Sequence, residues 1–389
     1  MPSLNTISLY IHWPFCVSKC PYCDFNSHVA KSLDADLWEQ SLLTELKTLG
    51  GRISPETTLE TIYFGGGTPS LMRPETVQKL IDSATKMLGT GTSIEITLEA
   101  NPTTFEEKKF KNFRQAGVNR LSLGIQSFDD SSLRFLGRAH DAKQALSALE
   151  NAFVIFPRVS FDLIYGLPKQ TLPAWRGQLA QAALFSPSHI SCYQLTFEPG
   201  TPFYTRFQRG DLTYPSDTKA LQFDRVTEKF WEQYGLKRYE VSNYAKPGYE
   251  SRHNLAYWQR KPTLGIGPGA HGRPLIKDIL YAEETHRAPE TWLSHVQKQG
   301  HGLKRSVTLA PKERLLEWLL MGLRLANGIN PLDCTKQTGQ TLRAWGLEEP
   351  IEDLAQQGFL ICTPKKIKAS PQGRACLNAV LTKLSQALH

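Results

Sequence analysis

Between residues 7 and 196 the chain alternates short apolar runs with longer amphipathic segments, and this alternation constrains the fold more than any other feature. The apolar runs predict strands at 8–11, 61–64, 94–98, 120–124, 160–164 and 189–195. The amphipathic segments predict helices at 34–49, 74–88, 105–116, 142–156 and 172–185. Strands joined by helical crossovers indicate an α/β fold with a parallel sheet, which right-handed crossovers curl towards a barrel. Six units are fewer than the eight of a complete TIM barrel.

The remainder of the chain has a different pattern. A helix is predicted at 218–233, a strand at 237–241 and a glycine-rich loop at 265–272, which lacks the spacing of a nucleotide-binding fingerprint. A boundary near residue 300 divides the chain into domains 1–300 and 301–389. In the second domain the pattern predicts helices at 311–324, 350–357 and 377–388, and short strands at 358–362 and 366–370. This order is similar to a winged-helix module, which reads DNA in some proteins and only packs in others.

Composition places the chain among globular proteins without a membrane span. Of 389 residues, 40% are hydrophobic and 21% are charged, and no apolar run is long enough to cross a bilayer. The first residues lack a charged and then apolar signal region. We therefore expect a cytoplasmic location, which suits seven cysteines that are mostly unpaired by spacing. The net charge of +8 comes from scattered basic residues, so no nucleic-acid partner is expected, whereas a substrate with carboxylates, such as a porphyrin, would be attracted.

Three cysteines, Cys16, Cys20 and Cys23, form a C-x3-C-x2-C pattern. Three thiolates within eight residues can ligate three irons of a [4Fe–4S] cluster. The fourth iron then lacks an obvious protein ligand and is open to another molecule. Two alternatives remain: a zinc site with His12 or His28 as fourth ligand, and a disulfide with one free thiol.

Polar residues and glycines follow nearly every predicted strand, where ligands gather in parallel α/β sheets. The glycines of 65–67 permit close approach of a ligand to the backbone, or form a tight turn. Asp162 interrupts an apolar strand, and a buried carboxylate needs a partner. The segments at these strand ends are Gly65-Gly66-Gly67-Thr68-Pro69, Glu99-Ala100-Asn101-Pro102, Gln126-Ser127, Tyr165-Gly166-Leu167-Pro168 and Tyr193-Gln194-Leu195.

Together these motifs resemble the radical S-adenosylmethionine (SAM) enzymes. The likeness is closest to the branch that contains oxygen-independent coproporphyrinogen III oxidase and the HemW haem chaperones. It implies a partial (βα)6 TIM-like barrel with a smaller C-terminal helical or winged-helix-like domain. It also implies that the open iron takes the amino and carboxylate groups of SAM and that the reduced cluster passes one electron to the sulfonium. The segments that carry the likeness are 10–16, the cysteines, 65–69, 99–102, 123–128 and 162–168.

The resemblance assigns a role to each site residue. Cys16, Cys20 and Cys23 would bind the cluster, and Tyr10 would lie against SAM. Contacts to the methionyl amine and neighbouring groups would come from Gly66, Gly67 and Thr68. Glu99 would accept hydrogen bonds from the amino or ribose groups. The ribose and carboxylate would be lined by Gln126, Arg138 and Asp162. Without the family, Arg138 is typical of an exposed helix residue.

Two departures favour the chaperones over the oxidase. Phe25 stands where the oxidase motif has a further cysteine, and only 15 residues precede Cys16, too few for the oxidase's leading segment. In addition, His253-Asn254-Leu255-Ala256-Tyr257-Trp258 matches the HNxxYW pattern of the chaperones. The likeness implies haem binding, with His253 as candidate axial ligand and with Tyr257 and Trp258 flanking the flat macrocycle. The alternative is a buried histidine with satisfied hydrogen bonds.

We therefore expect a haem chaperone without coproporphyrinogen III oxidase activity. Its cofactors would be a [4Fe–4S] cluster, SAM and haem. Its partners would be an electron donor for the cluster and a haem-acceptor protein, soluble or membrane-associated. The alternatives are the oxidase itself and a radical SAM enzyme that modifies RNA, for which no RNA-binding module is recognisable.

Overall fold

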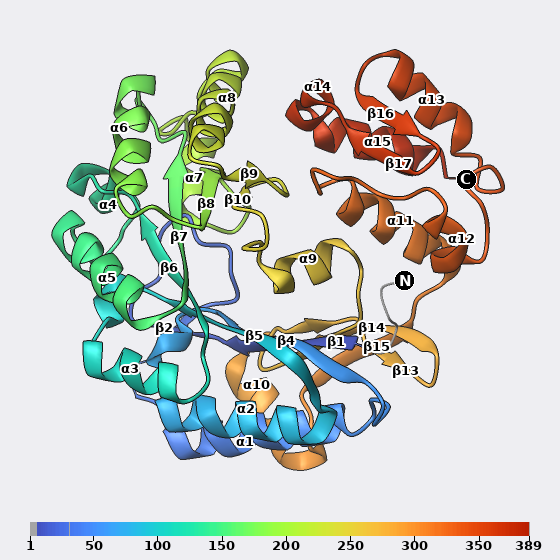
Figure 1. Cartoon of the computed structure of the whole chain (residues 1–389). Helices are drawn as coiled ribbons and strands as arrows, with labels where there is room; N and C mark the ends of the chain where they lie inside the picture. Colours follow the sequence, from blue (N-terminus) through green and yellow to red (C-terminus); the bar gives the residue numbers. More distant parts are fainter. Residues whose placement is uncertain (1–5, 31, 389) are drawn as a thin grey trace.

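The computed structural model describes residues 6–30 and 32–388, so the segment in which no signal region was expected lies outside the described residues. The largest sheet has nine strands in the order β11-β1-β4-β5-β6-β7-β8-β10-β9 (Figure 1). Its parallel centre is built from β1 (Thr6–Trp13), β4 (Thr58–Gly66), β5 (Thr90–Ala100), β6 (Arg120–Gln126), β7 (Arg158–Tyr165) and β8 (His189–Gln194). All six predicted strands are therefore confirmed.

Three further strands extend this sheet at its two edges. β11 (Thr263–Ile266) pairs in parallel with β1, whereas β10 (Asn243–Ala245) and β9 (Lys237–Arg238) add antiparallel strands beside β8. The strand predicted at 237–241 is thus shorter than predicted and ends at Arg238, and the predicted loop at 265–272 begins inside β11. No pairing joins β11 to β9 among the described residues, so the sheet is a partial barrel.

Helices between the parallel strands cover the outer face of this sheet, as the lower and left parts of Figure 1 show. Side-chain caps define their starts: Asp34 accepts from the Leu37 amide, and Asp141 forms a capping box with Gln144. The five predicted helices are confirmed within a few residues as α1 (Ala35–Gly50), α2 (Pro74–Leu88), α3 (Glu107–Gln115), α5 (Ala142–Ile155) and α6 (Leu172–Ala183). A short additional helix, α4 (Asp130–Phe135), precedes α5.

Short elements lie close to the carboxyl ends of the parallel strands. After β1 come β2 (Phe15–Cys16) and β3 (His28–Val29), which pair with each other and enclose the cysteine loop. The turns after β4 and β5 contain single 3-10 turns at Pro69–Leu71 and Pro102–Thr104. Beyond β8 the chain forms α7 (Pro202–Gln208), α8 (Asp217–Gln233) and α9 (Arg252–Trp258). After β11 follow β12 (His271–Gly272), β13 (Leu275–Ile276), β14 (Ile279–Thr285), α10 (Pro289–Gln299) and β15 (Leu303–Thr308).

The C-terminal part has a hydrophobic core of its own, which begins at Leu315 (orange to red in Figure 1). Its predicted helices and strands are present in the predicted order, with α12 and α14 added. β15 pairs with β14, so the predicted boundary at residue 300 would separate two paired strands. We propose that the boundary lies between β15 and α11. The elements are α11 (Pro311–Gly322), α12 (Asp333–Thr338), α13 (Glu348–Gln356), β16 (Leu360–Thr363), β17 (Lys366–Ala369), α14 (Pro371–Ala375) and α15 (Leu377–Gln386).

Among the described residues, no helix combines the length and the apolar character that crossing a bilayer requires.

Candidate functional site

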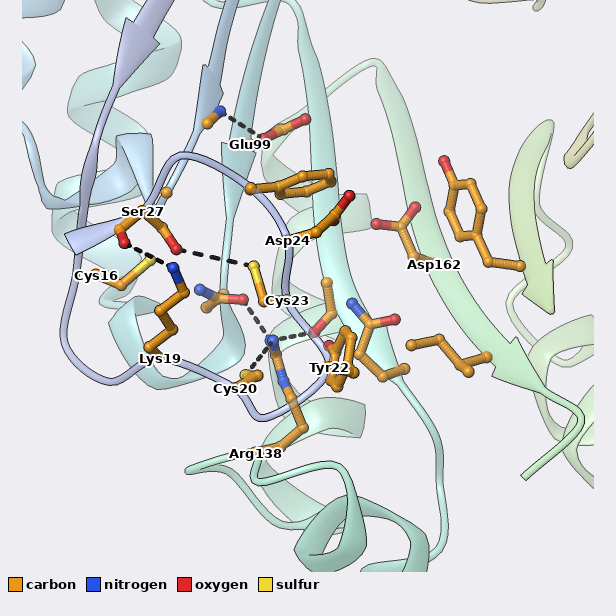
Figure 2. A pocket seen from close by; sticks show the side chains of 18 of the residues that line it. Cys16, Lys19, Cys20, Tyr22, Cys23, Asp24, Ser27, Glu99, Arg138 and Asp162 are labelled. Atoms are coloured by element: carbon orange, nitrogen blue, oxygen red, sulfur yellow. Dashed lines mark hydrogen bonds between the residues drawn. The ribbon is translucent and has the colours of Figure 1, made fainter. Parts of the chain in front are cut away.

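A cavity of about 330 Å³ lies at the carboxyl ends of the parallel strands (Figure 2). We call it the central cavity. Its walls come from the cysteine loop and from the ends of β4 to β8, as expected for a parallel sheet. Nine of the twelve predicted site residues line it: Cys16, Cys20, Cys23, Gly66, Gly67, Glu99, Gln126, Arg138 and Asp162. Sequence reasoning gave no role to four further lining residues, Tyr22, Asn101, Ser122 and Tyr193.

Each of the three cysteine sulfurs has a polar neighbour. Thr68 Oγ1 donates to Cys16 Sγ at 3.4 Å, and Arg138 Nη1 donates to Cys20 Sγ at 3.6 Å. Cys23 Sγ lies 3.8 Å from Ser27 Oγ. Hydroxyl and guanidinium donors stabilise thiolates, the form in which cysteine ligates metal. Burial raises the pKa of Cys16 and Cys23, so ligand binding at these thiols releases protons.

The histidines proposed as a fourth zinc ligand are both engaged by Asn26. His12 Nε2 lies 2.9 Å from the Asn26 carbonyl oxygen, and His28 Nε2 lies 3.2 Å from Asn26 Oδ1. Within the described ranges, no three His, Cys, Asp or Glu side chains converge as ligands of one ion do. All seven cysteines are free thiols. A cluster gives each cysteine its own iron, so it fits this arrangement better than one zinc ion or a disulfide.

The glycine loop packs closely against the strand that carries Cys16. A Cβ on Gly67 would lie 2.7 Å from the Phe15 carbonyl oxygen, and one on Gly66 would lie 2.7 Å from the His12 ring. Gly66 also has a φ of +113°, which disfavours any side chain. The glycines therefore bring the end of β4 against β1 and β2, and the cavity lies directly beside them.

Two carboxylates face the central cavity from β5 and β7 (Figure 2). Glu99 accepts from the Tyr63 hydroxyl at 2.7 Å and from the Gly66 amide at 3.2 Å. Burial raises the pKa of Glu99 to about 7, and the neighbouring charge of Asp162 adds to this shift. Burial also raises the pKa of Asp162 to about 6. Both groups would be stabilised by a ligand that brings an amine or hydroxyl groups.

Gln126 and Arg138 complete the polar wall. Gln126 has a φ of +68°, and its buried Oε1 has no hydrogen-bond partner among the described residues. Strained backbone and an unsatisfied acceptor are typical of ligand sites. Arg138 lies in the turn after α4, where its guanidinium points inwards, donates to the Gly124 carbonyl at 2.8 Å and bonds Asn101 Oδ1. The interpretation of Arg138 as an exposed helix residue is therefore wrong.

The other three predicted residues lie outside the central cavity. Thr68 is behind Cys16, where its hydroxyl joins Asn101 Nδ2, at 2.9 Å, to the Cys16 sulfur. Tyr10 lines a second cavity of about 360 Å³, which shares Phe25, Gly66 and Glu99 with the central cavity. We call it the side cavity.

His253 is 2% exposed and lines neither of these cavities. Its Nδ1 lies 2.7 Å from Thr61 Oγ1, and its ring stacks on Tyr63 with centroids 4.8 Å apart. Burial lowers the pKa of His253 to about 3. Its role as a haem ligand stays a prediction. The ring packs as a supporting histidine would, but its buried Nε2 has no hydrogen-bond partner among the described residues, so the alternative of a histidine with satisfied hydrogen bonds does not hold for both nitrogens.

Comparison with known proteins agrees with this site. The heme chaperone HemW of Haemophilus influenzae is 36% identical over 392 residues, covering 98% of each chain. HemW of Escherichia coli is also 36% identical, with 98% of each chain covered. The chain belongs to the HemW branch of the radical SAM superfamily. A bovine relative, the mitochondrial radical S-adenosyl methionine domain-containing protein 1, is 38% identical over all of this chain and 89% of its own length.

Matches to domain families support the same assignment. The radical SAM superfamily matches residues 10–176, and the HemN C-terminal domain matches residues 309–376. The crystal structure of coproporphyrinogen III oxidase (HemN) from Escherichia coli superposes with a TM-score of 0.82. It covers 99% of this chain and 91% of its own at 24% identity, which establishes the shared fold alone.

The family implies a [4Fe–4S] cluster and SAM. The central cavity fits both groups: three thiols line it, the Gln126 Oε1 acceptor lacks a partner among the described residues, and the carboxylates of Glu99 and Asp162 face the same space.

Proposed function

We propose that this protein is a haem chaperone, which binds haem and transfers it to an acceptor protein. The observation that carries the proposal is the similarity to HemW chaperones along nearly the whole chain, together with a central cavity equipped for the cofactors of that family. We further propose the cytoplasm as its location and an electron donor for the cluster as a second partner.

In this proposal Cys16, Cys20 and Cys23 hold the cluster. The cluster with SAM supplies one-electron chemistry, and the protein supplies orientation and exclusion of water. Arg138 neutralises charge beside Cys20, whereas Glu99 and Asp162 accept hydrogen bonds from the bound cofactor. Phe25 is 60% exposed and lines both the central and the side cavities. Its ring offers apolar surface where the oxidase motif has a thiol.

The decisive experiment compares chaperone and oxidase activities in the same anaerobically reconstituted protein. We expect ferric haem to bind with a new Soret band, and haem to move to an apo-haemoprotein in a second step. We expect no protoporphyrinogen from coproporphyrinogen III in the presence of SAM and a reductant. Catalytic turnover of coproporphyrinogen III would establish the oxidase instead, and absence of a Soret band would rule out both haem binding and chaperone function.

A further inference from the structure

A third cavity, of about 280 Å³, adjoins the side cavity next to the C-terminal domain. We call it the α11 cavity, because Glu317, Leu320 and Met321 of α11 form one of its walls. Tyr257 and His271 line both the side cavity and the α11 cavity. Pockets for sizeable ligands span about 300–1,000 Å³, so the two adjoining cavities together offer room for a ligand of that size class.

His271 is the histidine in these cavities whose ring is free. Among the described residues, no hydrogen bond of its imidazole is recorded, and the residue is exposed. His12, which also lines the side cavity, has both ring nitrogens occupied: Nδ1 lies 3.0 Å from the Tyr10 hydroxyl, and Nε2 faces the Asn26 carbonyl. A haem iron needs an imidazole nitrogen with a free lone pair. His271 can supply it, whereas His12 cannot without losing a bond.

Backbone pairing and the preceding turn hold His271 in position, and no hydrogen bond of its side chain contributes among the described residues. It begins β12, where it pairs with Glu284 of β14. The preceding turn contains Gly267 and Gly269, with φ of +90° and +80°. The Gly267 amide donates to buried Glu45 Oε2 at 2.7 Å. A free imidazole on an anchored turn is pre-organised to bind a ligand.

Apart from Glu99, which also lines the side cavity, the charges around the two cavities favour an anionic occupant. Arg287 lines the side cavity, and no carboxylate lies within ion-pair distance of it in the described part of the chain. In the α11 cavity, Arg260 and Arg273 share a single carboxylate, Glu317. One negative charge against two guanidinium groups leaves a surplus of positive charge. The two propionates of haem match this surplus.

We propose that haem binds in the side and α11 cavities, with His271 as an axial ligand of the iron and Arg287 facing a propionate. This inference rests on the proposed function of haem chaperone and adds the location of the haem site. Tyr257 of the HNxxYW motif then contacts the macrocycle directly. His253 acts behind it: its ring packs at 61° to the Tyr257 ring with centroids 5.1 Å apart. His253 is thus a positioning residue in this assignment.

Ferric and ferrous haem titrations of the anaerobically reconstituted full chain test the assignment. We expect His271→Ala to weaken haem binding at least about 10-fold, because a metal ligand contributes no less than its outer partners. We also expect it to abolish the iron–imidazole signature in resonance Raman and electron paramagnetic resonance spectra, and added imidazole to restore that signature. His253→Ala should retain the iron–imidazole signature even where affinity falls. His295→Ala, on α10 outside these cavities, is the matched control and should behave as wild type.

Arg287→Gln supplies a second, independent readout. We expect roughly 2- to 5-fold weaker binding of haem, as for an exposed ion pair, and no difference from wild type with haem dimethyl ester, which lacks the propionate charges. A wild-type spectrum in His271→Ala would overturn the site while leaving the chaperone function intact. Failure of the wild-type protein itself to bind haem would instead overturn the proposed function.

Discussion

Replacing Gly67 by alanine tests whether the glycine loop holds the cysteine strand in place. The added Cβ would lie 2.7 Å from the Phe15 carbonyl oxygen and 2.9 Å from the carbonyl carbons of Phe15 and Pro14. These are backbone atoms, so no side-chain rotation relieves the contact. The loop is also tied to this strand by the Gly67 amide to Trp13 oxygen bond at 2.7 Å and the Thr68 amide to Phe15 oxygen bond at 2.8 Å. Alanine at position 67 therefore has to displace β2, and Cys16 with it.

The magnitude follows from two opposing contributions. Overpacking of this kind costs about 1–3 kcal/mol, and each strained hydrogen bond costs roughly another 0.5–1.5 kcal/mol. The reduced freedom of the unfolded chain returns about 0.4–1 kcal/mol. With both hydrogen bonds strained, we expect Gly67→Ala to lower the free energy of unfolding by about 1–6 kcal/mol and to lower the iron and sulfide content after reconstitution.

Gly177→Ala is the matched control, because Gly177 lies inside α6 with no atom within 4 Å of its would-be Cβ. A helix interior favours alanine over glycine, so this variant should gain up to about 1 kcal/mol. Both variants are compared by anaerobic urea unfolding and by iron analysis. If Gly67→Ala unfolds at the wild-type urea concentration and holds wild-type iron, the argument from the Phe15 contact is refuted.

Three further predictions concern the carboxylates, the arginine and the second core. Because burial raises the pKa of folded Glu99 from 4.5 to about 7, the folded state holds more protons in that range, and the unfolding free energy should fall as pH rises from about 4.5 to 7. In cofactor-free protein, Glu99→Gln should reduce this fall in unfolding free energy by on the order of 1–3 kcal/mol. Equal pH dependence of the unfolding free energy in the wild type and the variant would contradict the raised pKa of Glu99. Arg138→Lys should lower the iron content with little loss of helicity by circular dichroism, because an ammonium group cannot reach Cys20, Gly124 and Asn101 together. Full iron incorporation in this variant would show that the three contacts of the guanidinium group are dispensable. Leu315→Ala, at a fully buried position, should lower the unfolding free energy by about 2–5 kcal/mol in thermal or urea unfolding. Leu332→Ala, at a position 63% exposed, should leave the unfolding free energy almost unchanged. Similar losses of stability in the two variants would place the second core elsewhere.

Local patterns in the sequence were sufficient for the longer helices and for the six central strands, whereas short helices such as α4 and α7 were missed. Capping residues such as Asp34 and Asp141 act on neighbouring amides, so the starts of their helices depend on nearby sequence alone. β11 was missed because Gly265 within it and Gly267 directly after it resemble a loop. Its strand conformation depends on pairing with β1, more than 250 positions earlier in the chain, and no local signal reports such a partner.

The residues of the site likewise divide into those that the local sequence identifies and those that only the fold brings together. The spacing of Cys16, Cys20 and Cys23 is local, so the sequence alone identified the cluster motif and the branch of the family. Asn101 was overlooked although it belongs to a segment at a strand end, and the strand-end rule is the signal that could have found it. Its bonds to Thr68 and Arg138 exist only because β4, β5 and the turn after α4 meet in space.

By itself, the sequence determined the order of the six central strands and the helices between them, the cysteine motif and the kinship with the HemW chaperones. The tertiary structure decided which polar side chains share a cavity. It moved His253 of the HNxxYW motif into the packed interior and left the ring of His271 facing two cavities. The physical reason is that exposure of a side chain depends on what packs against it. His253 packs against β4, whereas His271 lies on β12, whose pairing with β14 leaves the residue exposed.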